Sequence, residues 1–197
     1  MEGKKDTTEK EKIPSSNKNI RVLPDSSWLV AILREKDSHH ISALSALGAL
    51  EPYSPTCFIP TIVVMEVMSQ LIRKDKLSHT KAKDKLKKLF DKKLHPWHNK
   101  NLGVEDIMEK YKIFAKFRKI NTLKSVDFYI ASEGIGLDAR ILTCDIEMYK
   151  KVKKYYKKIY FLSDIVRDQK SDLARLIEDI QNVKQDMQPI SITEKIN

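Results

Sequence analysis

Short apolar runs that alternate with helical patterns are the feature that most limits the folds open to this chain. Four such runs lie at residues 20–23, 56–60, 139–143 and 158–163, and each is long enough for one short strand. The segments between and after them place apolar residues every three or four positions, which predicts helices. Strands that alternate with helices are typical of α/β proteins. We therefore predict an α/β fold whose central sheet is mostly parallel.

The predicted helices share this three-to-four spacing. They lie at residues 25–33, 39–50, 61–74, 78–94, 104–119, 123–136, 145–156 and 170–186. In the second of them, Ile41, Leu44 and Leu47 recur at every third position. The helix at 123–136 is expected to stop at its glycines. Residues 95–103 favour a loop or a short edge strand.

The chain is expected to form one domain with a tail at each end. It has 197 residues, of which 41% are hydrophobic, and this is enough for a single core. Residues 1–19 are highly charged and have no apolar period, so they are predicted to be a disordered tail. Residues 20–163 hold the ordered domain, and residues 164–197 are a polar, partly helical extension.

Charge and cysteine content favour an intracellular protein with a polyanionic partner. The formal net charge is +10, which is typical of proteins that bind nucleic acid. Cys57 and Cys144 both lie in apolar runs, as buried thiols in a reducing compartment do. No secretory signal and no membrane-spanning apolar window is evident. We expect a cytoplasmic location without membrane association.

Two acids follow predicted strands. Asp25 follows the run at 20–23, and Asp145 follows the run at 139–143. The carboxyl ends of parallel strands meet at one edge of the sheet, where α/β proteins bind their ligands. Aspartate is also a preferred N-cap residue, so each acid could simply cap the helix that follows.

Two further acids lie within apolar helical segments. Glu66 stands in "VVMEVM" and Asp127 in "SVDFYI". A buried carboxylate is costly unless it is paired or bound to a cation. Glu66 could lie on a solvated stripe and Asp127 could cap its helix, but four such acids in one small domain favour a cation site. Carboxylate oxygens suit Mg²⁺ or Mn²⁺.

Four blocks of this sequence resemble the signature blocks of the PIN domain family, in their usual order. The blocks are "VLPDSSWLVAIL", "IPTIVVMEVMSQL", "LKSVDFYIAS" and "ILTCDIEMYKKV". The similarity covers about residues 20–163. It implies a three-layer fold with a mostly parallel central sheet of four to five short strands, flanked by helices.

The resemblance also implies a metal-dependent ribonuclease that acts on RNA with Mg²⁺ or Mn²⁺. The implied catalytic and metal-binding residues are Asp25, Glu66, Asp127 and Asp145. Ser27 and Thr143 match positions that carry a supporting hydroxyl. The three aspartates would hold the ion directly or through water, and Glu66 would add a ligand or orient the attacking water. Cleavage would leave a 5′-phosphate and a 3′-hydroxyl.

In size and simplicity the domain is similar to VapC-type toxins, the ribonuclease members of toxin–antitoxin pairs, so an antitoxin protein is a candidate partner. Three features depart from the family pattern. Bulky Phe128 and Tyr129 follow the third acid, Glu133 stands where a small residue is common, and residues 164–197 extend past the usual end. The first two bear on the shape of the site's rim, and the last bears on the assignment to a simple toxin.

Two lysine-rich segments are candidate RNA contacts. Residues 74–93 carry nine lysines against three aspartates, and residues 150–158 carry six lysines. Lysine binds a nucleic-acid backbone without reading its sequence. The candidate contacts are Lys83, Lys87, Lys150, Lys153 and Lys154. A solvated helix face explains the same lysines equally well.

Other functions stay open at this point. A housekeeping RNA-processing nuclease and a catalytically silent, PIN-like RNA-binding scaffold share most of these features. An aspartyl-phosphate phosphatase would need an aspartate at the position of Ser27, and the histidines form no zinc-ligand set. A homodimer is expected, because residues 28–50 and 61–73 are more apolar than a small monomer needs and because the resemblance supports it.

Overall fold

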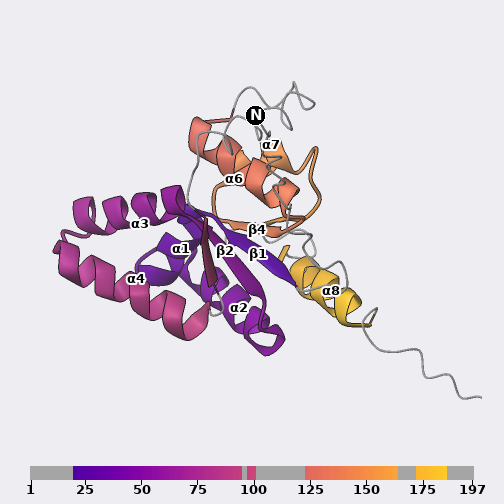
Figure 1. The fold of residues 1–197 in the computed structure, drawn as a ribbon, viewed down its shortest axis with the longest axis horizontal. Helices are drawn as coiled ribbons and strands as arrows, with labels where there is room; N and C mark the ends of the chain where they lie inside the picture. Colours follow the sequence, from indigo (N-terminus) through magenta and orange to yellow (C-terminus); the bar gives the residue numbers. More distant parts are fainter. Residues whose placement is uncertain (1–19, 95–96, 101–122, 164–171, 186–197) are drawn as a thin grey trace, which may run out of the picture.

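The computed structural model describes residues 20–94, 97–100, 123–163 and 172–185. At its centre is an all-parallel sheet of five strands in the order β3-β2-β1-β4-β5 (Figure 1). The strands are β1 (Arg21–Pro24), β2 (Thr56–Pro60), β3 (Trp97–Lys100), β4 (Arg140–Thr143) and β5 (Ile159–Phe161). The predicted α/β fold with a parallel sheet is confirmed, and the segment expected to be a loop or an edge strand forms β3.

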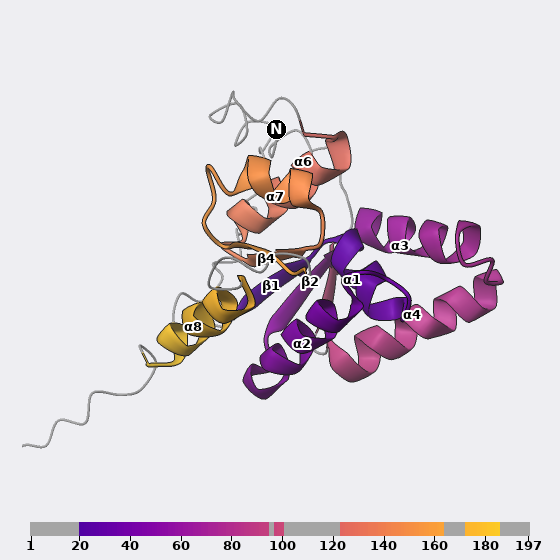
Figure 2. The same cartoon turned by 180° about the vertical axis from the view of Figure 1, so that it is seen from behind.

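Helices flank this sheet on both faces. Those in the described ranges are α1 (Ser26–Leu33), α2 (His40–Leu50), α3 (Thr61–Arg73), α4 (His79–Lys93), α6 (Ser125–Gly136), α7 (Ile146–Val152) and α8 (Asp172–Gln185), with a 3₁₀ turn at Glu51–Tyr53. Figures 1 and 2 show α6 and α7 on one face and α1 to α4 gathered on the other. The expected three layers are therefore present. The tail predicted at 1–19 and the helix predicted at 104–119 lie outside the described residues.

The register of the strands brings the ends of β1 and β4 together. Pro24 pairs with Leu142, and the backbone N–H of Asp25 donates to the carbonyl of Leu142 at 2.8 Å. Because parallel strands end at the same edge of a sheet, the residues that follow β1 and β4 meet there. The first turn of α3 reaches the same edge, since it follows β2 directly and β2 runs parallel to β1.

The central strands are the most buried part of the molecule. Leu23, Ile141 and Leu142 are wholly shielded from solvent. Continuous burial of this kind is typical of parallel strands held between two layers of helices. β4 also carries polar groups into the buried layer at both of its ends, Arg140 at its start and Thr143 at its end.

The buried face of α2 differs from the one that spacing by threes would suggest. Its buried side chains are Ala43, Ala46, Leu47 and Leu50. Ile41 and Leu44 are instead 71% and 43% exposed. A step of three residues falls about 60° short of a full helical turn, so a series of such steps drifts off one face.

The ends of α6 and α7 also hold corrections. α6 ends at Gly136 as predicted, but no glycine adopts the left-handed conformation there, and Asp138 does so instead with φ of 50°. Gly134 serves close packing, because a Cβ atom at that position would lie 2.5 Å from Cδ1 of Ile141. The helix predicted through residue 156 ends at Val152, where the chain turns toward β5.

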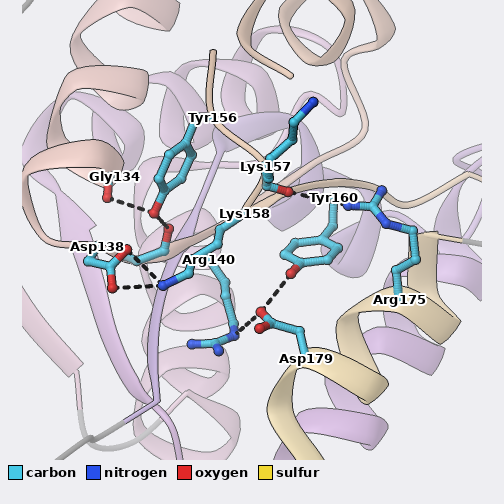
Figure 3. Close-up of polar contacts among 10 residues, drawn as sticks. Gly134, Asp138, Arg140, Tyr156, Lys157, Lys158, Tyr160, Arg175 and Asp179 are labelled. Atoms are coloured by element: carbon cyan, nitrogen blue, oxygen red, sulfur yellow. Dashed lines mark hydrogen bonds and ion pairs between the residues drawn. The ribbon is translucent and has the colours of Figure 1, made fainter. Parts of the chain in front are cut away.

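The helix α8 packs beside β5, at one edge of the sheet (Figures 1 and 3). Leu176 and Ile180 are fully buried, and Asp172 accepts a hydrogen bond from the backbone N–H of Phe161 at 2.9 Å. α8 thus covers an edge that would otherwise offer unpaired backbone groups. In the part of the chain that is described, no helix has the length and the apolar character needed to span a membrane.

Candidate active site

The four predicted acids come from four different helices that begin at the carboxyl edge of the sheet. Asp25 is the N-cap residue of α1 and Asp145 is the N-cap residue of α7. Asp127 lies in the first turn of α6, and Glu66 lies in the second turn of α3. The order of strands and helices therefore brings together residues that are up to 120 positions apart in the sequence.

Asp25 is the most deeply buried of the four, with 4% of its surface exposed. Its Oδ1 accepts a hydrogen bond from the backbone N–H of Ser26 at 2.7 Å, which caps α1. Its Oδ2 accepts hydrogen bonds from the hydroxyls of Ser27 at 2.5 Å and Thr143 at 2.9 Å. Both carboxylate oxygens are thus held by donors, which fixes the orientation of the side chain.

The hydroxyls of Ser27 and Thr143 connect the ends of β1 and β4. The two oxygens lie 3.2 Å apart. Ser27 Oγ also accepts from the backbone N–H of Cys144, and Thr143 Oγ1 accepts from that of Asp145, each at 2.9 Å. The resemblance pointed to these two residues as supports for the acids, and the structure places them in direct contact with Asp25.

The pKa of the Asp25 carboxyl is raised above its ordinary value. Burial is the main cause, and the charge of Asp145 adds to it. The hydrogen bonds from Ser27, Thr143 and Ser26 act in the opposite direction, because they stabilise the ionised form. A bound cation would favour the ionised carboxylate and would therefore act against both of the effects that raise this pKa.

The pKa values of Glu66 and Asp127 are also raised, by burial and by the charges of neighbouring acids. Burial and then the charge of Asp25 raise the pKa of Glu66, whereas hydrogen bonding from Ser26 and the charge of Lys124 lower it. Burial, followed by the charges of Asp25 and Asp145, raises the pKa of Asp127 to about 6. Such effects fall off steeply with distance. All four acids therefore belong to one electronegative cluster.

The simpler explanations of these acids are partly correct as well. The Oδ1 atom of Asp145 caps α7 by accepting from the backbone N–H groups of Glu147 at 2.8 Å and Met148 at 3.0 Å. Glu66 is only half-buried, so it is partly solvated as a surface residue would be. Neither explanation accounts for the position of all four carboxylates at one end of the sheet. Capping and membership of the cluster are compatible.

The donor chemistry of the cluster fits a hard divalent cation such as Mg²⁺ or Mn²⁺. Like-charged carboxylates that raise one another's pKa are stabilised when a cation neutralises them. Among the described residues, no three His, Cys, Asp or Glu side chains lie close enough to share one ion directly. Ligation partly through water is consistent with that spacing, since Mg²⁺ commonly keeps several of its waters.

Two residues near the cluster were missed in the sequence. Ser26 contacts Asp25 and lowers the pKa of Glu66, and Lys124, the N-cap residue of α6, places a positive charge near Glu66 and Asp127. The signal for Lys124 was its position three residues before the third acid. A lone lysine at a helix start carries little weight in a chain with so many lysines.

The bulky residues Phe128 and Tyr129, which follow the third acid, contact the hydrophobic core. Both side chains are partly buried. Glu133 is 1% exposed on α6. These three residues, which account for the first two departures from the family pattern, are therefore accommodated inside the domain.

The candidate RNA-binding lysines lie in different settings. Lys83 and Lys87 are exposed on α4, and Lys150 and Lys154 are exposed on or just after α7. Lys153 is half-buried, lies over the ring of Tyr149 and pairs with Asp172 at 3.5 Å. Lys150 also lies 4.0 Å from Glu147, so two of these five lysines are near an acidic partner among the described residues.

Comparison with known proteins bears on the whole domain. A model of the PIN domain family matches residues 22–154, more than half of the chain and a span that contains all four acids. No curated protein matches the sequence. The chain therefore belongs to the PIN domain family, whose members are in general metal-dependent nucleases.

Proposed function

We propose that this chain is a divalent-metal-dependent endoribonuclease whose catalytic residues are Asp25, Glu66, Asp127 and Asp145. The observation that carries the proposal is geometric: all four acids lie near the starts of helices at the carboxyl edge of the sheet, and the buried Asp25 is held in place by Ser27 and Thr143. A domain gains nothing in stability from such crowding of like charge. It gains a binding site for a cation, and through it a way to act on a phosphodiester.

In the proposed mechanism, Asp25, Asp127 and Asp145 would hold Mg²⁺ or Mn²⁺ directly or through water. The ion, when bound, would supply Lewis-acid chemistry at the phosphodiester and lower the pKa of water. Ser27 and Thr143 keep Asp25 oriented through its Oδ2 atom. Glu66 provides a further ligand or orients the attacking water. The products are a 5′-phosphate and a 3′-hydroxyl.

The test is cleavage of single-stranded RNA with Mg²⁺ or Mn²⁺. We expect Asp25→Asn and Asp145→Asn to lose activity by a factor of about 10² or more, because each removes a charge that the ion needs. Asp84→Asn is the matched control, since Asp84 is exposed on α4 and lies outside the cluster. Equal activity in all four proteins would refute the assignment. The absence of cleavage by the wild type would favour a silent RNA-binding scaffold.

For the biological role, we propose the ribonuclease half of a toxin–antitoxin pair, with an antitoxin protein as its partner. The resemblance to VapC-type toxins supports this role. Expression of the wild type should slow growth, whereas Asp25→Asn should not. Relief of the toxicity by a neighbouring gene would identify the antitoxin. Cleavage without toxicity would favour a housekeeping RNA-processing nuclease instead.

We also propose that the protein forms a homodimer. Ile41 and Leu44 are exposed one turn apart on α2, and their burial in an interface would remove this apolar surface from water. Light scattering at micromolar concentration should give twice the monomer mass. Ile41→Glu should lower that mass if α2 lies in the interface. A monomeric mass for the wild type would contradict the proposal.

A further inference from the structure

The outer surface of α4 is strongly positive. Its inner face is made of Ala82, Leu86, Leu89 and Phe90, all buried. Its exposed lysines are Lys81, Lys83, Lys85, Lys87, Lys88, Lys92 and Lys93. With two aspartates in the same helix, these seven lysines give α4 a net charge of +5 from its Lys and Asp residues.

Four of these lysines are aligned on one flank of the helix. Lys81, Lys85, Lys88 and Lys92 follow one another at spacings of four, three and four residues. Such spacing places side chains one above the other along a helix. The series spans eleven residues, which is about 16 Å at the rise of an α-helix. We call these four residues the α4 lysine stripe.

The α4 lysine stripe has no partner within the described residues. Asp84 lies one turn before Lys88, yet no carboxylate in the described ranges comes within ion-pair distance of the four ammonium groups. Like charges at these spacings destabilise a helix. Asp84 and Asp91 on the same helix offset this charge only in part, so the array is suited to an external polyanion.

The lysines around α7 are used differently. Lys153 pairs with Asp172 at 3.5 Å, Lys158 pairs with Asp138 at 2.7 Å, and Lys150 lies 4.0 Å from Glu147. These ion pairs offset much of the positive charge of that segment. The two lysine-rich segments look alike in the sequence. On α4, Lys93 pairs with Glu51 at 3.1 Å, whereas the four lysines of the stripe make no ion pair with any described residue.

We propose that the α4 lysine stripe is a binding site for the phosphate backbone of RNA, separate from the acidic cluster. The inference rests on the proposed ribonuclease function. α4 packs along α3, the helix that carries Glu66, and the two helices project from the sheet as a hairpin (Figures 1 and 2). The stripe therefore lies on the helix that packs against the one carrying Glu66. Lysine contacts of this kind are independent of base sequence.

The binding test uses single-stranded RNA of about 20 nucleotides in EDTA, so that cleavage plays no part. The stripe variant combines Lys81→Gln, Lys85→Gln and Lys88→Gln. We expect its Kd to rise about tenfold or more, and its plot of log Kd against log salt to become shallower by about 2, because each lost contact removes about 0.7 from the slope. The control combines Lys10→Gln, Lys12→Gln and Lys36→Gln, which removes the same charge from positions outside both lysine-rich segments.

A second variant guards against misfolding. Replacement of the same three stripe lysines by arginine keeps the charge, and it should keep the wild-type affinity and salt slope. If the stripe and control variants weaken binding equally, net charge alone is responsible and the proposal is overturned. Unchanged affinity in the stripe variant overturns it too, and would favour an acidic protein as the ligand of α4.

Cleavage distinguishes this inference from the proposed function. If the wild type cleaves RNA, the stripe variant should show a KM raised about tenfold with kcat retained. If the wild type binds RNA through the stripe but does not cleave it with Mg²⁺ or Mn²⁺, the nuclease assignment fails and the stripe stands. If the wild type cleaves RNA and the stripe variant has an unchanged KM, the nuclease assignment stands and the proposal for the stripe fails.

Discussion

The two ends of β4 hold buried charge in opposite ways. At its start, Arg140 is 3% exposed and its Nε atom lies 2.7 Å from a carboxylate oxygen of Asp179 on α8 (Figure 3). At its end, Thr143 contacts Asp25, a buried acid that shares its surroundings with Asp145. At the start of β4, the matched end, opposite charges form an ion pair, whereas at its other end two carboxylates lie near each other. The fold can therefore neutralise a buried charge, and it does not do so where the sheet offers a ligand site.

The matched end is a network that joins α8 to the sheet. The hydroxyl of Tyr160 donates to Asp179 at 2.6 Å, and the guanidinium of Arg175 lies 5.3 Å from the centre of the Tyr160 ring. Burial raises the pKa of Tyr160, and its bond to Asp179 raises it further, so the phenol stays protonated as a donor. At this end Asp179 therefore has two partners, the guanidinium of Arg140 and the hydroxyl of Tyr160.

The largest effect should come from breaking the matched end. Asp179→Ala would leave the guanidinium of Arg140 buried without its carboxylate, which costs about 3 kcal/mol. Urea denaturation should report this loss in the free energy of unfolding. Asp138→Asn is the control, because asparagine tolerates the left-handed conformation of this position. Lys158 and Asp138 are both more exposed than Arg140 and Asp179, and an exposed pair contributes less than about 1 kcal/mol. Equal losses would mean that the Arg140 pair has no special weight.

The next effect should come from adding a cation to the other end. At a Mg²⁺ concentration about a hundred times its Kd, the wild type should gain about 2.7 kcal/mol, because the ion binds only the folded state. Asp25→Asn should gain much less, since it removes the most buried carboxylate. Thermal unfolding with and without Mg²⁺ measures both. A similar gain in the two proteins would place the ion elsewhere.

A smaller effect should follow from removing like charge in the metal-free protein. The pKa of Asp127 is about 6 in the folded state, above its ordinary value of 3.8, so its ionised form destabilises the fold. This cost is present above pH 6 and disappears as the pH falls below about 4. Asp127→Asn should therefore raise the free energy of unfolding by about 1 kcal/mol at pH 7.5, since partial exposure screens the effect.

At pH 3.5, Asp127→Asn should not raise the free energy of unfolding, because Asp127 is then largely protonated and asparagine is uncharged. A titration of the Asp127 carboxyl by NMR in EDTA offers a direct check, with a midpoint near pH 6. A midpoint near 4 would mean that the acids do not interact in solution.

Local patterns were sufficient for the acids and for most of the elements. Asp25 and Asp145 could be placed at one edge because each follows a strand in an α/β alternation. That rule needs only the order of elements. Ser27 and Thr143 came from a resemblance, and no periodicity would have found them. The hydrogen bonds that make them useful depend on the register between β1 and β4.

Other features could not be read locally. Lys124 and Ser26 became relevant only when α6 and α1 were seated on the sheet. Ile41 and Leu44 fit a helical spacing, yet packing turned them outward. The lysines of α4 and those of residues 150–158 cannot be told apart in the sequence. Lys153 pairs with Asp172 and Lys158 pairs with Asp138, and both aspartates lie outside the lysine-rich segment, more than ten residues from its nearer end.

The sequence by itself determined the order of strands and helices, the family and the identity of the four acids, because apolar period and local motif carry that information. Only the tertiary structure decided that these acids lie close enough to affect one another's charge. It also decided that Arg140 pairs with Asp179 and that the α4 lysine stripe makes no ion pair with the described residues. Those outcomes depend on strand register and helix rotation. A shift of one residue in either would rearrange every charge pair while leaving the local patterns unchanged.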